Sequence, residues 1–136
     1  MTEAQIYKAF ARYMSIAHPR VIYRFDYGAG TYLSWKQSVE QKSINSLSGY
    51  PDLFIAKPCG VYYGAFFEIK KKGSDPYLKR GAKRGMLRDN VHVQEQADML
   101  DRLRKYGYYA EFAVGLDELI ELTEKYLKLN TKNQNP

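Results

Sequence analysis

Three charged residues stand at the ends of two strand-like stretches: Asp52 precedes the apolar run 53–56, and Glu68 and Lys70 close the run 61–70. Side chains alternate along a strand, so Glu68 and Lys70 share one face. If a hairpin sets Asp52 opposite Glu68, the two carboxylates converge and repel each other unless a cation lies between them. Such oxygen ligands suit Mg²⁺ or Mn²⁺. With a lysine to stabilise developing negative charge, this set could hydrolyse a phosphodiester.

The same three residues also fit an exposed hairpin with a solvated salt bridge, and the short pattern alone leaves both interpretations open. Two further polar residues have similar alternatives. Gln96 shares an apolar helical stripe with Val93 and Leu100, where its amide either bonds to backbone or holds a water on a metal. Glu3 continues the stripe of the first helix, or complements the helix dipole.

Charge is concentrated in one segment of the chain. Residues 70–90 hold eight basic residues against Asp75 and Asp89, a balance of +6, whereas the remaining chain has 13 basic and 13 acidic residues. A basic segment directly after a carboxylate pair favours a polyanionic substrate such as DNA. Lys70 belongs with the carboxylate pair, and the other seven basic residues of the segment are the candidate DNA-binding residues: Lys71, Lys72, Lys79, Arg80, Lys83, Arg84 and Arg88.

Composition indicates an ordinary globular protein, with 45% hydrophobic and 26% charged residues in 136. No run approaches the roughly 18 apolar residues of a membrane-spanning helix. Glu3, Lys8 and Arg12 fall where a secretory segment would be apolar, and the single Cys59 permits no internal disulfide or cysteine metal cluster. We therefore expect a cytoplasmic protein in a reducing compartment.

Periodicity and capping signals predict a single domain over residues 1–129, followed by a polar tail at 130–136. Capping boxes at Thr2 to Gln5 and Ser34 to Gln37 open helices that end near residues 17 and 46. Strands are expected at 21–25, 53–56, 61–70 and 108–114, and further helices at 92–106 and 116–129. Residues 71–90 read as a long loop. This order predicts an α/β fold with a mixed sheet flanked by helices.

Two other features are less informative. The glycines at 28 and 30 favour a connection over a nucleotide-binding loop, and Asp26 beside them has no assigned role. His18 and His92 are the only histidines, and neither has a spaced partner that would indicate a zinc site.

Pro51-Asp52 with Glu68-Ile69-Lys70 resembles the signature of the PD-(D/E)XK nuclease superfamily. A longer ordered set is similar to the VRR-NUC family of virus-type replication-repair nucleases. It comprises Glu3, Gly-Tyr-Pro-Asp-Leu at 49–53, Glu68-Ile69-Lys70, Gln-Glu-Gln at 94–96 and the leucines and glycine at 100–107. The short form looks like the stand-alone members found in phages and prophages.

The resemblance implies a restriction-endonuclease-like core. Asp52 and Glu68 would bind the metal together with the backbone carbonyl of Ile69, and Lys70 would be the catalytic lysine. Gln96 and Glu3 match the family's helix glutamine and N-terminal helix acid. Stand-alone members are similar to Holliday junction resolvases and act as homodimers on branched DNA. This chain departs from them by its longer basic loop.

The leading hypothesis is therefore a Mg²⁺- or Mn²⁺-dependent DNA endonuclease. The alternative is a non-catalytic nucleic-acid-binding module that keeps the nuclease fold. A third interpretation, a basic protein-interaction adaptor, would leave Asp52, Glu68, Lys70 and Gln96 unconnected in space.

Overall fold

The computed structural model describes residues 1–26, 34–45 and 47–129. The expected tail at 130–136 and the glycines at 28 and 30 lie outside the described residues. In chain order the elements are α1 (Glu3–Ala17), β1 (Tyr23–Phe25), α2 (Trp35–Ile44), β2 (Leu53–Ile55), β3 (Ala65–Lys70), α3 (Val91–Lys105), β4 (Tyr109–Val114) and α4 (Gly115–Leu127). None of these helices is long and apolar enough to cross a membrane.

The four strands form one mixed sheet in the order β1-β2-β3-β4. β2 runs antiparallel to β1 and β3, whereas β4 runs parallel to β3 after the crossover through α3. Leu53 pairs with Phe67 and Ile55 with Ala65. Extending this register by one residue sets Asp52 opposite Glu68, as the sequence predicted.

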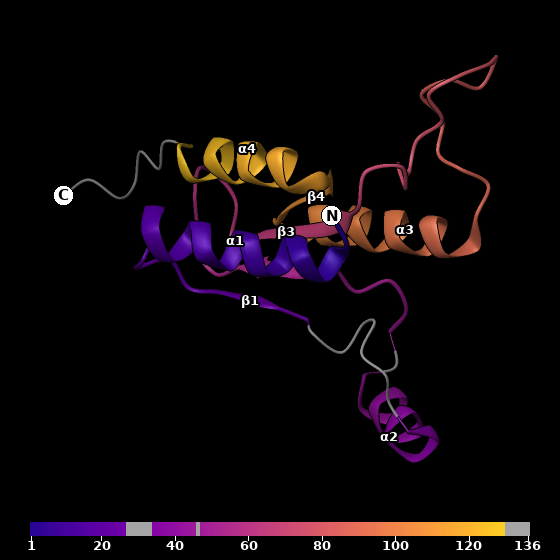
Figure 1. The fold of residues 1–136 in the computed structure, drawn as a ribbon, viewed down its shortest axis with the longest axis horizontal. Helices are drawn as coiled ribbons and strands as arrows, with labels where there is room; N and C mark the ends of the chain where they lie inside the picture. The colour runs from indigo at the N-terminus through magenta and orange to yellow at the C-terminus, as the bar shows by residue number, and fades with distance from the viewer. Residues whose placement is uncertain (27–33, 46, 130–136) are drawn as a thin grey trace.

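Helices cover both faces of the sheet (Figure 1). α1 and α4 pack on the face that carries Ala65, Phe67 and Ile69, and α3 packs on the face that carries Phe66. The alternation of side chains along β3 thus separates two apolar clusters, both of which bury residues of this central strand. The α/β fold with a mixed sheet between helices is confirmed.

Most expected bounds agree with the structure within about two residues, as helix ends usually do. Both predicted capping boxes form, because Thr2 and Ser34 each accept a hydrogen bond from the backbone of the glutamine three residues later. Two strand starts were wrong. The strand expected at 61–70 begins only at Ala65, because the Tyr62 N–H bonds to the Cys59 oxygen and closes a turn there. The first strand begins at Tyr23 rather than at residue 21.

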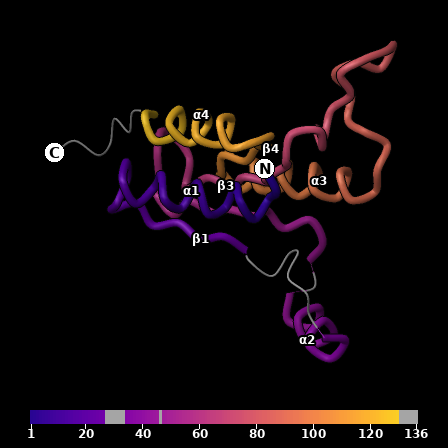
Figure 2. The backbone as a smooth tube through the Cα atoms, in the orientation of Figure 1, coloured from indigo at the N-terminus to yellow at the C-terminus, as the bar shows by residue number. Residues whose placement is uncertain are grey.

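Two segments stand away from the sheet and its covering helices (Figure 2). α2 buries none of its ten residues. Residues 71–90, which we call the basic arm, leave the end of β3 and return to the start of α3 without an assigned helix or strand. The predicted loop character of the arm is therefore confirmed, although the arm has a folded stem.

Candidate active site

Asp52 and Glu68 meet where β2 begins and β3 ends. Both are buried, with 5% and 4% of their surface exposed. Asp52 Oδ2 accepts a hydrogen bond of 2.8 Å from the backbone N–H of Ile69, which fixes this carboxyl across the end of β3. The sheet register, rather than a loop, therefore brings the two acidic groups together.

Burial of these two carboxyls shifts their pKa values upward. The pKa of Glu68 is raised to about 9, first by burial and then by the neighbouring charge of Asp52. Burial also raises the pKa of Asp52, against the Ile69 N–H, the neighbouring Glu68 carboxyl and Tyr7, which favour its charged form. A buried Glu68 whose ionisation is disfavoured by burial and by Asp52 makes a site that a cation would relieve.

Gln96 reaches this pair from α3, across the sheet face that carries Glu68. Its Nε2 donates a hydrogen bond of 2.7 Å to Glu68 Oε1. Glu68 Oε2 and Gln96 Oε1 are both buried and have no hydrogen-bond partner within the described part of the chain. Unpartnered buried oxygens are costly, so this pair fits a metal ion and its water better than it fits a core amide bonded to backbone.

The donor set determines which metal fits. In residues 1–26, 34–45 and 47–129, no group of three or more His, Cys, Asp and Glu side chains could hold a metal ion. A zinc-type cage is therefore not found among these residues. Two carboxylates with neighbouring oxygen atoms match Mg²⁺ or Mn²⁺, since Mg²⁺ commonly keeps several waters and uses one or two protein carboxylates.

Gly49 makes the approach of the Asp52 segment to α3 possible. Its φ is +81°, and a Cβ built on it would lie 2.7 Å from the backbone oxygen of Glu95 and 3.1 Å from the backbone nitrogen of Gln96. Any larger residue would push the segment 49–52 away from the helix. This contact couples the position of Asp52 to that of Gln96.

Lys70 and Glu3 lie at the rim of the buried pair. The positive charge of Lys70 lowers the pKa of Glu3, Asp52 and Glu68, so it lies within electrostatic reach of all three. Glu3 is exposed in the first turn of α1, so of the two alternatives the structure favours the one in which its charge complements the helix dipole. Its pKa is nevertheless raised, first by partial burial of the carboxyl and then by Asp52.

Sequence reasoning missed Tyr7, which lies one helical turn after Glu3. Its ring is buried and stacks on Phe25, with 4.7 Å between ring centroids. Its hydroxyl donates a hydrogen bond to Asp52, and burial together with that carboxyl raises the pKa of Tyr7 well above its usual range. The spacing of four residues from Glu3 was the available signal, because positions i and i+4 share a helix face.

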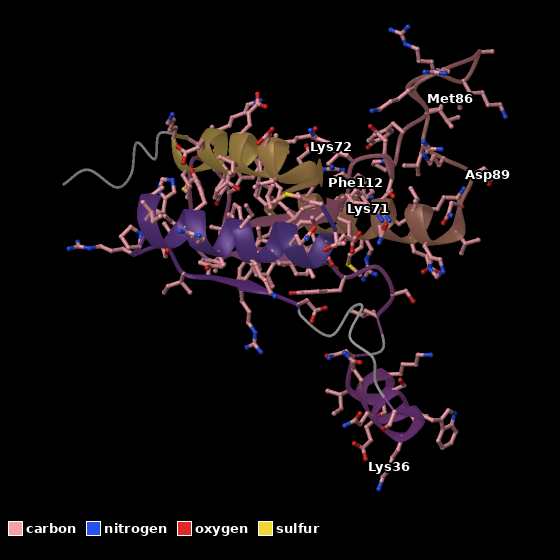
Figure 3. The ribbon with its side chains drawn as sticks, in the orientation of Figure 1. Lys36, Lys71, Lys72, Met86, Asp89 and Phe112 are labelled. Carbon is pink, nitrogen blue, oxygen red and sulfur yellow. The ribbon has the colours of Figure 1, made fainter. Side chains whose placement is uncertain are left out.

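The candidate DNA-binding residues fall into different environments. Lys71 and Lys72 lie at the base of the basic arm (Figure 3), and the Lys72 stem packs beside Gly115. Lys79 forms an ion pair of 3.2 Å with Asp75, and Arg88 Nε donates to the backbone oxygen of Asp75. The remaining three, Arg80, Lys83 and Arg84, are exposed. Lys79 and Arg88 thus have a structural contact that the sequence did not indicate.

Two residues left open by the sequence lie outside the carboxylate pair. The backbone N–H of Asp26 donates 2.7 Å to the backbone oxygen of Asp52, and Asp26 lines a pocket of about 370 Å³ with Arg24 and Tyr50. His18 Nε2 lies 2.5 Å from Glu124 and links α1 to α4. Neither residue takes part in the contacts around Glu68.

Comparison with solved structures identifies a chain described as "VRR_NUC domain protein". The two chains are 24% identical, the match covers 96% of this chain and 91% of that one, and the TM-score is 0.64. This likeness shows that the two chains share a fold over nearly their whole lengths. No protein-family model matches the chain, and no curated protein matches it.

Proposed function

We propose that this chain is a metal-dependent DNA endonuclease of the VRR-NUC type, which hydrolyses phosphodiester bonds in branched DNA. The observation that carries the proposal is the pair of buried oxygens beside Asp52, Glu68 Oε2 and Gln96 Oε1, which have no hydrogen-bond partner among residues 1–26, 34–45 and 47–129. Asp52, Glu68, Lys70 and Gln96 interact in one place, which argues against the adaptor interpretation. The shared fold supports a nuclease-family domain.

Asp52, Glu68 through Oε2 and the backbone carbonyl of Ile69 would hold a Mg²⁺ or Mn²⁺ ion. When bound, such an ion supplies charge neutralisation at the phosphate and lowers the pKa of a coordinated water. The Ile69 N–H donates a hydrogen bond to Asp52 Oδ2, and Gln96 Nε2 donates one to Glu68 Oε1. Each of these bonds leaves the other oxygen of its carboxylate for the metal.

The remaining residues orient the reactants. Gln96 Oε1 can accept a hydrogen bond from the attacking water, and Lys70 can donate to a phosphate oxygen as negative charge develops there. The water oxygen forms a bond to phosphorus while the ester oxygen on the opposite side leaves, so inversion at phosphorus is expected. Glu3, at the exposed rim, would bind a second water at the approach to the site.

A homodimer is proposed as the working form, because a dimer offers two related sites to a branched DNA. α2 supports this proposal. It exposes Trp35 and Ile44 to 82% and 78%, and isolated helices of ten residues are marginal in water. A second copy of the chain would give this helix a packing partner.

Cleavage of a panel of labelled substrates tests the function directly. Flaps, forks, four-way junctions and linear duplex are incubated with the protein in Mg²⁺, in Mn²⁺ and in EDTA. We expect metal-dependent cleavage that is faster on branched substrates. Lys70→Ala should abolish cleavage and leave DNA binding nearly intact, because the lysine acts on the reacting phosphate.

Lys105→Ala is the matched control, since Lys105 is an exposed lysine at the end of α3 that pairs with Asp101. It should cleave like the wild type. Wild-type turnover by Lys70→Ala would refute the role of this lysine. Tight binding with no cleavage of any substrate in either metal would instead favour the non-catalytic binding module.

A further inference from the structure

The stem of the basic arm is a two-stranded ladder. Tyr77 pairs with Leu87 in antiparallel fashion, and the N–H of Leu78 donates 2.8 Å to the oxygen of Met86. Further hydrogen bonds join Gly85 to Leu78 and Arg88 to Pro76. The arm is therefore a hairpin with a defined register.

This register gives the stem two faces. Residues opposite each other in an antiparallel pair point to the same side, and neighbouring pairs point to opposite sides. Tyr77 and Leu87 face the body. The Tyr77 ring is 42% exposed but lies edge-on to Phe112 with 6.0 Å between ring centroids, and Leu87 packs against the cluster around Leu100. Leu78 and Met86 consequently form an apolar pair on the outward side.

Met86 is the exposed member of the outward pair, Leu78 is half-buried, and positive charge surrounds both. Met86 is 58% exposed and lies on the part of the arm that extends beyond the sheet (Figure 3). Residues 76–88 contain five basic residues and no acidic one, and Arg80, Lys83 and Arg84 are exposed around the turn. An exposed methionine backed by a half-buried leucine, between cations, matches DNA, which offers phosphates on the outside and apolar base faces inside.

We propose that Leu78 and Met86 form a wedge that enters an interrupted base stack while Arg80, Lys83 and Arg84 bind the flanking phosphates. This inference rests on the proposed function and names its substrate class, duplex DNA whose stacking is already broken at a branch point. An intact duplex must be unstacked before an apolar side chain can enter, at a cost in free energy, whereas a branch point is already open. The wedge thus provides a physical reason for branch preference.

Binding in EDTA tests the wedge without cleavage. Anisotropy measures the affinity for a four-way junction and a linear duplex of matched arms at several salt concentrations. A 2-aminopurine base at the branch reports unstacking. Met86→Ala should weaken junction binding about five- to tenfold and reduce the 2-aminopurine signal, with linear duplex binding unchanged. Met86→Leu should restore both.

The triple variant Arg80→Ala, Lys83→Ala and Arg84→Ala is the matched control for charge. It should weaken binding to the junction and to the linear duplex by the same factor. It should also reduce the slope of log K against log salt by about 2.7, for three phosphate contacts at roughly 0.9 each. Met86→Ala should leave this slope unchanged, because it removes no charge. Circular dichroism confirms that each variant is folded.

The wedge is refuted if Met86→Ala leaves the junction-to-duplex affinity ratio and the 2-aminopurine signal at wild-type values. It is equally refuted if the variant weakens both DNAs by the same factor. If the wild-type protein cleaves no substrate but prefers junctions in a way that depends on Met86, the endonuclease proposal is refuted and the wedge is not. If the wild-type protein cleaves in a metal-dependent way but Met86→Ala does not change junction binding, the wedge is refuted and the endonuclease proposal is not.

Discussion

Glu68→Gln should stabilise the metal-free protein while abolishing cleavage. The Glu68 carboxyl is 4% exposed, and burial beside Asp52 raises its pKa to about 9 from an ordinary value of 4.5. At pH 7 the folded protein therefore keeps a proton on this group, whereas the unfolded chain releases it. Glutamine keeps the volume and the oxygen that accepts from Gln96, but it has no proton to lose.

The size of the effect follows from this difference in pKa. Holding the carboxyl protonated costs about 1.4 kcal/mol for each pH unit above 4.5, so ~3 kcal/mol at pH 7. For a chain of this size that corresponds to a shift in melting temperature on the order of 10 °C. Because the folded pKa is the higher one, the contribution of Glu68 to wild-type stability is fully present below about pH 4.5 and is lost as pH rises toward about 9.

Thermal and urea unfolding in EDTA between pH 4 and pH 9 measures the difference. The two proteins should be alike near pH 4, and the glutamine variant should gain steadily above pH 5. Glu121→Gln, an exposed position on α4, is the matched control and should follow the wild type at every pH. Adding Mn²⁺ at pH 8 should stabilise the wild type far more than Glu68→Gln. Parallel stability curves over the whole range would refute the reasoning.

Three further predictions test the same site and the assembly. Asp52→Asn should lower Mn²⁺ affinity at least about tenfold, because it removes an anionic ligand, and unchanged affinity in calorimetry would exclude Asp52 as a ligand. Tyr7→Phe should weaken Mn²⁺ binding by roughly tenfold through the lost hydrogen bond to Asp52. Tyr23→Phe is the control for this variant. Equal Mn²⁺ affinities of Tyr7→Phe and Tyr23→Phe would exclude a role of Tyr7 in metal binding. Light scattering should return twice the chain mass, and a value near 15.8 kDa at micromolar concentration would contradict the dimer.

Local chemistry made much of the fold predictable. A capping hydroxyl and a glutamine three residues later satisfy helix N–H groups wherever they occur, so the starts of α1 and α2 could be predicted from four residues each. Alternation along β3 likewise assigned Phe66 and Glu68 to one face and Phe67 to the other. A hairpin connects β2 to β3, so even the pairing of Asp52 with Glu68 was within reach.

The side chains around that pair were harder to predict. Tyr7 reads as one of several tyrosines in an apolar helix, and only the packing of α1 on the sheet brings its hydroxyl to Asp52. Lys79 and Arg88 read as free cations, yet their contacts to Asp75 depend on the fold of the arm. Such contacts join elements whose relative placement no local pattern encodes.

By itself, the sequence determined the acidic pair, the lysine that follows it, the glutamine of the later helix and the basic charge of residues 70–90. Only the tertiary structure decided that Gln96 reaches Glu68 and that two oxygens are buried there without a partner in the described part of the chain. It also decided that Leu78 and Met86 face outward while Tyr77 is held against Phe112. The physical reason is that residue type and spacing set local conformation, whereas burial, and with it the pKa of Glu68, depends on which distant surfaces exclude water together.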